Sequence, residues 1–495
     1  MKKEYIILGL IFTLTLSARL YFAFNSGNFD YDAYFNLRQS QYIMQQGFPD
    51  YNDQYSYGGR FYTFLPLFHY VLALFGFVFG LEFTAKLLPN IFAASLSIIV
   101  YFISKHITKD EAASLVSAFI SGFVPIFFSE TINTVSVLTA VVPIMFFLMY
   151  NFINIKKGQK YIINYIIFFV ILTLLHPSSI LLVLAIYFYL MLCKIEKMKI
   201  TKSELEIPIF SIFFWLWANL MVYKKAFLVH GLAVVWQNLP FMLFKQNFEG
   251  INIVQALLKI GFIPFLFGLF IIYKGFFGER KKATYFFVSF AFSTAIMLWL
   301  KLISLTMGFI FLGVVLAILF SQFYAKLFNY IEKTKLANFK HYFVIGIIMV
   351  FLITSVLPSI FDTINRGHIP ADSEISAMKW IEANTPEDST VLTSPEEGHM
   401  MIYYAMRKDV ADTNFLLINN PGERMQDIND MYRARFKTQG ISLLNKYEIN
   451  YIYLSPLTKT LYNVEDIPYN DHECFKEIYS KDGIDIYSSL CILEG

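Results

Sequence analysis

Two carboxylates stand close together near the N-terminus, directly after an apolar segment. Residues 29–38 read Phe-Asp-Tyr-Asp-Ala-Tyr-Phe-Asn-Leu-Arg, so Asp30 and Asp32 are followed by Asn36 and Arg38. Asp32 and Asn36 are four residues apart and share one face if this run is helical. Such a carboxylate can bind a divalent cation through its oxygens or accept a proton from an attacking hydroxyl. Asp is also a favoured helix N-cap, and the residue types alone leave that structural role open for Asp32.

Three further candidates lie where apolar segments end. Glu130 belongs to the stretch Ser-Glu-Thr-Ile-Asn at 129–133 and is either a second acidic group of a site or a solvated boundary residue. His176 precedes Pro177 at another junction and is a candidate substrate-binding residue, with a purely interfacial role as its alternative. Lys301 separates the apolar runs 284–300 and 302–325, where a charge is costly and by default functional. It could pair with a lipid phosphate, and snorkelling to the headgroups is the alternative.

A fourth group of candidates follows a predicted strand in the C-terminal part of the chain. Residues 394–399 read Ser-Pro-Glu-Glu-Gly-His and would open a helix. Strand-to-helix turns often carry function because a rigid scaffold positions them. Glu397 and His399 are therefore predicted to bind substrate. For Glu396 and Glu397, ordinary first-turn acids favoured by the helix dipole are the alternative.

The composition is that of a membrane protein. Apolar residues make up 56% of the chain and charged residues 16%, against roughly 45–50% and about 25% in soluble chains. The net charge of +3, without a long basic run, argues against a nucleic-acid partner. Three scattered cysteines are too few for a structural zinc site. The apolar stretch from Tyr5 to Phe24 exceeds the roughly 7–15 residues of a signal peptide, which predicts an uncleaved first helix.

A helix needs about 20 mostly apolar residues to cross the hydrocarbon. The chain is therefore predicted to be a polytopic α-helical membrane protein with about eleven transmembrane helices. The predicted spans are residues 4–24, 84–104, 112–128, 134–153, 161–175, 178–193, 207–223, 251–273, 284–300, 302–325 and 342–361.

The apolar segment 61–80 is assigned by charge, because Lys and Arg accumulate in cytoplasmic loops. If it lies along the surface or re-enters, the basic loops all fall on the side of Lys2 and Lys3; they are 105–109, 156–160, 194–202, 274–282 and 326–340. The protein is then a multi-pass cell-membrane protein with a cytoplasmic N-terminus. The loops 25–83 and 224–250, and everything after Phe361, are predicted to lie outside.

Residues 1–361 are predicted to form the transmembrane domain and 362–495 a small extracytoplasmic α/β domain. Apolar density falls after Pro358, and helices alternate with apolar strands. The expected elements are helices at 373–384, 397–406 and within 422–446, strands at 389–393, 408–412 and 449–454, and a final hairpin turning at Asp482-Gly483.

That hairpin predicts a disulfide bond. A two-residue turn at Asp482-Gly483 would place Tyr479 opposite Ile486 and Cys474 opposite Cys491. Counting from the turn makes the cysteines a non-hydrogen-bonded pair, with Cα atoms about 4.5 Å apart, within reach of a disulfide. An oxidising compartment outside the membrane would allow the bond to form. Two unpaired thiols are the alternative.

The run 32–38, the long outer loop and the acidic second loop resemble membrane glycosyltransferases of the GT-C superfamily, and among them the catalytic subunits of prokaryotic oligosaccharyltransferases. The resemblance covers residues 1–154 and 377–415. It implies that Asp32 is the first-loop aspartate that binds metal at the reacting centre. It also implies that Glu130 stands in the second acidic motif, usually Asp-x-Asp and here Glu-Thr-Ile-Asn at 130–133.

The stretch from Glu397 to Ala405 resembles the block after the strand in the soluble domain of that family. Oligosaccharyltransferases carry there the acceptor-reading motif Trp-Trp-Asp-Tyr-Gly, and this chain has Ser-Pro-Glu-Glu-Gly at 394–398. The departure favours an acceptor other than the protein sequon. An oligosaccharyltransferase for protein glycosylation with an altered acceptor site is the alternative within the family.

These features predict a glycosyltransferase on the outer face of the membrane that transfers sugar from a polyprenyl phosphate or diphosphate to a protein or glycan acceptor. The sequence has no nucleotide-binding glycine loop. Asp32, helped by Asp30 and Glu130, would bind a divalent cation (Mg²⁺ or Mn²⁺) or deprotonate the acceptor. Arg38 and Lys301 would neutralise the leaving phosphate.

A lipid-linked sugar flippase or transporter is the alternative from another class. Transporters place ionisable residues near mid-membrane, often on broken helices. The acidic candidates of this chain cluster at predicted helix ends on one side, which favours the enzyme.

Overall fold

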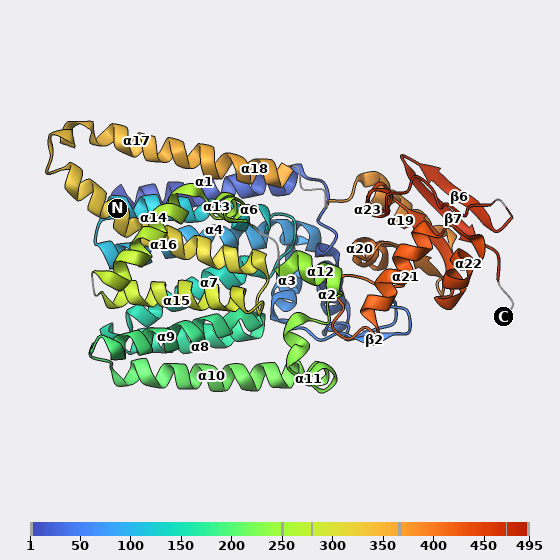
Figure 1. The fold of residues 1–495 in the computed structure, drawn as a ribbon, viewed down its shortest axis with the longest axis horizontal. Helices are drawn as coiled ribbons and strands as arrows, with labels where there is room; N and C mark the ends of the chain where they lie inside the picture. The colour runs from blue at the N-terminus through green and yellow to red at the C-terminus, as the bar shows by residue number, and fades with distance from the viewer. Residues whose placement is uncertain (1–2, 249–251, 279–280, 365–368, 472, 493–495) are drawn as a thin grey trace.

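The computed structural model describes residues 3–248, 252–278, 281–364, 369–471 and 473–492. Figure 1 shows a bundle of long helices and, at one end of it, a smaller domain with a sheet. The bundle begins with α1 (Lys3–Asn25) and ends with α18 (Leu357–Ile364), and the smaller domain begins with α19 (Asp372–Asn384). The chain is a multi-pass α-helical membrane protein with a small C-terminal α/β domain.

Each predicted span coincides with helix in the described part of the chain, but two of them, 112–128 and 251–273, are each divided between two helices. Seven segments are long and apolar enough to cross a membrane: α1, α4 (Leu81–Thr108), η2 and α9 (Pro177–Ile195), α10 (Lys202–Val222), α15 (Lys282–Trp299), α16 (Leu305–Ile331), and Lys335–Ile364, which joins η4 (Lys335–Phe339), α17 (Lys340–Phe351), η5 (Leu352–Val356) and α18. Three further predicted spans coincide with shorter apolar helices, which are α5 (Glu111–Gly122), α7 (Leu138–Ile153) and α8 (Gln159–Leu175). The short helices α6 (Pro125–Ser129) and η1 (Ile155–Lys157) follow α5 and α7.

The predicted single span 251–273 is wrong as a continuous helix. Residue 251 lies outside the described residues, and the rest forms α13 (Ile253–Ile260) and α14 (Phe262–Phe277), which meet at an angle of 104°. Gly261 stands between them with φ +101°, a backbone conformation that side chains disfavour. A Cβ atom there would also lie 2.7 Å from Ser355 Oγ. The break therefore needs this glycine.

The basic loops gather at the end of the bundle away from the smaller domain. Lys105, at the end of α4, pairs with Glu4 at the start of α1. Lys156 and Lys282 lie 3.7 and 3.4 Å from the carboxylate of Glu204, in the first turn of α10. The N-terminus is at this end in Figure 1. The predicted separation of basic loops from the C-terminal domain is thus present in the fold.

The loop 25–83, named the first outer loop because it is predicted to lie outside, folds at the opposite end of the bundle, against the smaller domain (Figure 1). It contains α2 (Ala33–Gln46), the paired strands β1 (Asn52–Asp53) and β2 (Arg60–Phe61), and α3 (Leu67–Phe79). With 13 residues, α3 is shorter than the roughly 20 that a crossing needs. The helices α5, α7 and α8 are short as well, so length alone does not separate α3 from them, and the surface-lying or re-entrant position of 61–80 stays a prediction.

The second long outer loop lies at the same end of the bundle. It contains α11 (Lys224–His230), η3 (Gly231–Trp236) and α12 (Phe241–Phe248). Figure 1 shows α11 beside the end of α10, and α12 between the bundle and the smaller domain. Both outer loops therefore lie between the helix bundle and the smaller domain (Figure 1).

The smaller domain is built on a five-stranded sheet of order β4-β3-β5-β7-β6. The first three strands are parallel, and β7 is antiparallel to β5 and β6. The strands are β3 (Thr390–Leu392), β4 (Lys408–Asp409), β5 (Ile449–Leu454), β6 (Phe475–Lys481) and β7 (Ile484–Ser489), and the helices after α19 are α20 (Pro395–Ala405), α21 (Pro421–Arg433), α22 (Lys437–Lys446) and α23 (Pro456–Tyr462). All predicted elements are present, and α23 is an addition.

The predicted disulfide between Cys474 and Cys491 is confirmed, with Cα atoms 5.0 Å apart. Near the turn the register is as expected, because Tyr479 pairs with Ile486. Farther out it is wrong by one residue, since a bulge between Glu477 and Tyr479 shifts the pairing. An extra residue in one strand bends that strand and displaces every later pair. The cysteines lie just beyond the two strands, where they still meet.

Candidate active site

Asp32 stands at the start of α2, and its carboxylate faces outward. Its own backbone is helical, with φ −68° and ψ −22°, and its side chain makes no capping hydrogen bond. Instead, Oδ1 of Asp32 accepts a hydrogen bond of 2.7 Å from Thr413 Oγ1 in the smaller domain. The side chain is exposed, whereas the neighbouring Asp30 is buried. The capping alternative for Asp32 is therefore wrong, and its carboxylate is presented at the junction of the two domains.

The acidic second loop lies directly beside this motif. The backbone N–H of Asp30 donates to Asn133 O at 3.0 Å, and Asn36 Nδ2 donates to Val135 O at 3.3 Å. Asn133 and Val135 have φ values of +61° and +49°. For a β-branched residue such as Val135 this is a genuine outlier, of the kind that surrounding contacts must hold in place. The backbones of the two loops are thus in direct contact.

The side chain of Glu130 lies at the other end of that loop. Glu130 follows α6, and its negative charge interacts electrostatically with the carboxylate of Asp362 in α18. The positive charge of Lys259 in α13 interacts electrostatically with the same carboxylate. The structure therefore places Glu130 where α6, α13 and α18 meet, and its proposed share in metal binding stays a prediction.

His399 brings the smaller domain to the same place. It lies on α20, is buried, and packs its ring against that of Phe35 on α2, with ring centres 5.2 Å apart and planes tilted by 48°. His399 Nδ1 is 3.2 Å from Asp412 Oδ2. Burial lowers the pKa of His399, and the carboxylates of Asp412 and Asp32 oppose that shift. An imidazole, a buried carboxylate and the exposed Asp32 thus converge from opposite ends of the chain.

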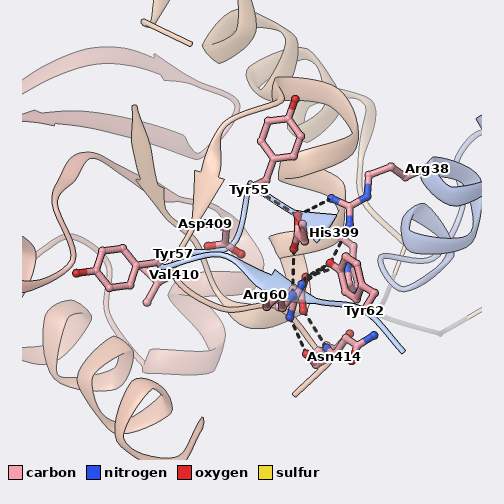
Figure 2. Close-up of polar contacts among 12 residues, drawn as sticks. Arg38, Tyr55, Tyr57, Arg60, Tyr62, His399, Asp409, Val410 and Asn414 are labelled. Atoms are coloured by element: carbon pink, nitrogen blue, oxygen red, sulfur yellow. Dashed lines mark hydrogen bonds and ion pairs between the residues drawn. The ribbon is translucent and has the colours of Figure 1, made fainter. Parts of the chain in front are cut away.

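Arg60 holds the first outer loop to the smaller domain (Figure 2). Its Nε is 3.0 Å from Asp53 Oδ2, and its Nη1 donates to Asn414 O at 2.6 Å. Its Nη2 contacts both Asp412 and the hydroxyl of Tyr62. Burial alone would raise the pKa of Asp412, but Arg60 and His399 hold it well below the usual range. Arg60 therefore neutralises two buried carboxylates from different domains.

Arg38 belongs to the same buried network. Its Nη2 donates to the hydroxyl of Tyr62 at 2.8 Å, and its Nη1 lies 3.7 Å from Asp53 Oδ1. The side chain is 4% exposed. The structure thus gives Arg38 a part in positioning α2 and the β1–β2 hairpin. Its predicted contact with a substrate phosphate stays a prediction.

The segment between β1 and β2 also extends the sheet of the smaller domain (Figure 2). Asp409 N donates to Tyr55 O at 2.7 Å, and Tyr57 N donates to Asp409 O at 2.8 Å. Arg424 Nη1 bridges Tyr57 O and Val410 O at 3.1 and 3.0 Å. Backbone hydrogen bonds to the edge strand β4 fix register as well as contact. The outer loop and the smaller domain therefore form one framework around Asp32.

Gly398 permits the close packing of α20 on the segment 409–412. A Cβ atom at Gly398 would collide with Asp409 Oδ2 and lie 2.8 Å from Asp412 Cβ and 3.0 Å from Ala411 O. We expect Gly398→Ala to destabilise the protein by about 1–3 kcal/mol, the usual cost of overpacking. Thermal unfolding of the purified protein measures this.

Gly422, in α21, is the matched control because nothing lies within 4 Å of its Cβ position. Alanine favours a helix over glycine, so Gly422→Ala should leave the unfolding temperature unchanged or raise it. Equal unfolding temperatures for the two variants would contradict the packing argument.

Glu397 lies in the interior of the smaller domain. Its carboxylate accepts hydrogen bonds from the hydroxyls of Ser394 and Thr458, both at 2.6 Å, and from that of Ser455. Burial raises the pKa of Glu397 to about 7. These contacts join α20 to the start of α23. The predicted substrate contact of Glu397 is untested, and the position observed is one that holds the domain together.

His176 and Lys301 have local partners at the outer helix junctions. His176 Nδ1 accepts from Ser178 N at 3.1 Å, which caps the turn between α8 and α9. Trp236 Nε1 donates to Lys301 O at 2.8 Å, and Lys301 Nζ lies 5.7 Å from the ring centre of Phe244. Lys301 is thus covered by the second outer loop, and the substrate roles of both residues stay predictions.

A divalent cation fits the site only if substrate completes its ligands. Among the residues that the structure describes, no group of three or more His, Cys, Asp and Glu side chains could hold a metal ion. Mg²⁺ and similar cations often take one or two protein carboxylates together with phosphate oxygens. The exposed carboxylate of Asp32 is suited to that role, and its Oδ1 already accepts one hydrogen bond from Thr413.

The residues that sequence reasoning missed come from the hairpin and from the segment after β4. They are Asp53, Arg60, Tyr62, Asp412 and Thr413. Nothing in their local sequence distinguishes them from surface polar residues. Their role arises from pairing between segments about 350 residues apart in the chain, as in the contact of Arg60 with Asp412 at a separation of 352.

Comparison with known proteins gives partial sequence matches and a full-length match in fold. Dolichyl-phosphooligosaccharide-protein glycotransferase 2 of Archaeoglobus fulgidus is 35% identical over 104 residues, which are 20% of this chain. The match spans only 17% of that protein's length. No family model matches the chain.

The solved structures show the fold. The apo oligosaccharyltransferase of A. fulgidus aligns with a TM-score of 0.71 at 13% identity, over 94% of this chain and 72% of that one. The same protein has been solved in complex with zinc and sulfate. ArnT from Cupriavidus metallidurans, bound to undecaprenyl phosphate, aligns with a TM-score of 0.60 at 10% identity, over 99% and 98% of the two chains. The chain therefore has the fold of the GT-C membrane glycosyltransferases.

Proposed function

We propose that this protein transfers a glycosyl group from a polyprenyl phosphate or diphosphate carrier to an acceptor at the outer face of the membrane. The observation that carries the proposal is the exposed carboxylate of Asp32, fixed by Thr413 where the helix bundle meets the smaller domain. A lipid carrier reaches this level from the bilayer, and an acceptor reaches it from outside. The likeness in fold to a transferase bound to undecaprenyl phosphate supports the same donor class.

Asp32 would be the reacting carboxylate, and the residues around Asp32 would fix its orientation. Its free carboxylate oxygen can accept the proton of an attacking hydroxyl or amide, or bind a divalent cation. When bound, that cation would neutralise charge on the leaving phosphate. Thr413 orients the carboxylate, and His399 stands behind it in a buried position. Lys301, at the outer end of α15, is the cation that we propose for the lipid phosphate.

Protein glycosylation is the second candidate. Local identity of 35% to an archaeal protein glycotransferase favours it, and that relative acts on protein by its name. Ser394 to Gly398, which replace the acceptor-reading motif of the resemblance, argue for a different acceptor. In the structure this stretch is buried apart from the half-buried Glu396, and Gly398 packs against Asp412.

Reconstitution into liposomes tests the reaction. The protein is supplied with lipid-linked sugars extracted from a membrane and with peptide or glycan acceptors, and mass spectrometry follows both. A transferase consumes the donor and leaves a glycosylated acceptor together with the free lipid carrier, which is polyprenyl phosphate from a monophosphate donor and polyprenyl diphosphate from a diphosphate donor. A flippase would move the donor across the bilayer unchanged, and that outcome would refute the proposal.

Metal removal is expected to lower transfer. If Asp32 and the donor phosphate share a divalent cation, a chelator should reduce the rate by an order of magnitude or more, since such cations supply several kcal/mol of charge stabilisation. Restoring Mg²⁺ or Mn²⁺ should return it. Transfer that continues undiminished after exhaustive chelation would leave Asp32 as a base alone.

Cysteine labelling tests the proposed orientation. In a Cys193→Ala background, an impermeant maleimide applied to intact cells should label Asp388→Cys, in the smaller domain, and spare Lys199→Cys, between α9 and α10. Both native side chains are exposed, so reactivity reports sidedness rather than burial. The reverse pattern would place the smaller domain and Asp32 in the cytoplasm.

A further inference from the structure

The second outer loop turns an apolar surface away from the protein. We call residues 224–248, comprising α11, η3 and α12, the strap. Leu232 is 85% exposed and Phe241 is 82% exposed. The other large exposed apolar side chains of the strap are Leu228, Val229, Val235, Trp236 and Met242. A patch of this kind marks an interaction surface.

The orientation of the strap is fixed by polar contacts along its other edge. His230 Nε2 hydrogen-bonds Leu416 O at 2.7 Å, and Asn238 Nδ2 donates to Phe415 O and Ile418 O, both at 3.1 Å. These carbonyls belong to the segment 413–418 of the smaller domain. Because the polar edge is held there, the apolar side chains cannot turn inward and need another partner.

The apolar surface continues one that already faces lipid. The crossing helix α10 ends at Val222, and its last turns expose Leu220 and Met221. The helix α11 begins two residues later. The strap is long and apolar enough for a membrane segment, but it is bent by 47° between Trp236 and Phe241 and so cannot be one straight span.

The charges at the start of the strap suit a membrane boundary. Lys224 and Lys225 open α11, and Lys225 Nζ lies 3.3 Å from the ring centre of Phe61 in the first outer loop. Lysines next to an apolar helix snorkel to the headgroups. Trp236, whose indole N–H is hydrogen-bonded while its ring is partly exposed, has the amphipathic character of interfacial tryptophans.

We propose that the strap lies in the membrane interface, with its apolar side in the acyl region of the leaflet nearer the smaller domain. Interfacial helices bury their apolar face about 5–10 Å into the headgroup and acyl boundary. The strap holds the segment 413–418, and Thr413 in that segment holds Asp32. Insertion would therefore set the height of Asp32 above the bilayer. The proposal does not depend on the reaction.

Environment-sensitive fluorophores in liposomes test the insertion. An NBD label is attached to Phe241→Cys in the full-length Cys193→Ala protein, and its emission and quenching by nitroxide-labelled phospholipids are recorded. Phe436→Cys is the matched control, because Phe436 is an equally bulky side chain, 71% exposed, directly before α22 of the smaller domain. The label at 241 should emit at shorter wavelength than the label at 436 and be quenched by the labelled lipids.

Two results would overturn the proposal. Emission and quenching at position 241 that match position 436 would place the strap in water. A blue shift at 241 without quenching by lipid would mean that protein, such as a second copy of this chain, covers the surface. Neither readout uses catalytic activity, so failure here leaves the proposed transfer reaction intact.

Discussion

The Asp32→Asn variant should lose at least about 100-fold of the transfer rate, because removal of a positioned general base or of a carboxylate ligand costs roughly 10²–10⁴. The substitution keeps an oxygen that can accept the hydrogen bond of Thr413 Oγ1, so the junction of the domains should stay intact. What disappears is the negative charge and the basicity. Initial rates in the liposome assay, with saturating donor, measure the loss.

Asp388→Asn is the control for this experiment, since Asp388 is an exposed carboxylate of the smaller domain. It should transfer sugar at the normal rate. Asp32→Glu retains the charge on a longer stem and should keep a small part of the activity. An Asn variant with near-normal transfer would mean that the carboxylate has only a structural role, and the proposed site would have to be abandoned.

Arg60→Met should be the most destabilising single substitution at the domain junction. It leaves the carboxylates of Asp53 and Asp412, 1% and 2% exposed, without the guanidinium that contacts both. Removing one partner of a buried ion pair costs about 3–5 kcal/mol. We expect a clearly lower unfolding temperature and faster proteolysis between the bundle and the smaller domain.

Arg435→Met is the matched control, because Arg435 is exposed on the smaller domain. Arg60→Lys keeps the charge and loses the planar fork, so its stability should fall between those of Arg60→Met and the parent. Adding Asp53→Asn to Arg60→Met should recover part of the loss. Unfolding of Arg60→Met at the same temperature as Arg435→Met would contradict the role assigned to this network.

The membrane part could be predicted well because its determinant is local. A run of apolar residues has a favourable place in the bilayer whatever the rest of the chain does. Each predicted span accordingly coincides with helix where the structure describes it, although 112–128 and 251–273 are each divided between two helices. The break at Gly261 was not predicted, because a glycine in an apolar run is also tolerated within a continuous helix. Its positive φ becomes necessary only where α13 and α14 pack as they do.

In the smaller domain, too, features with a local cause were predicted correctly and a feature without one was not. The turn at Asp482-Gly483 and the pairing of Tyr479 with Ile486 follow from local turn chemistry. The bulge beyond Glu477 has no such local cause, and it shifts the pairing by one residue. The disulfide of Cys474 with Cys491 survived that shift because both cysteines lie beyond the strands.

For the candidate site, the sequence by itself determined that Asp32 stands shortly after the first membrane helix, since apolar length fixes where the chain leaves the bilayer. Only the tertiary structure decided which groups surround it. Thr413 and His399 come from the far end of the chain, and Arg60 joins carboxylates of two domains. A buried charge is stable only beside its partner, and the partner of a given charge is set by packing rather than by its neighbours in sequence.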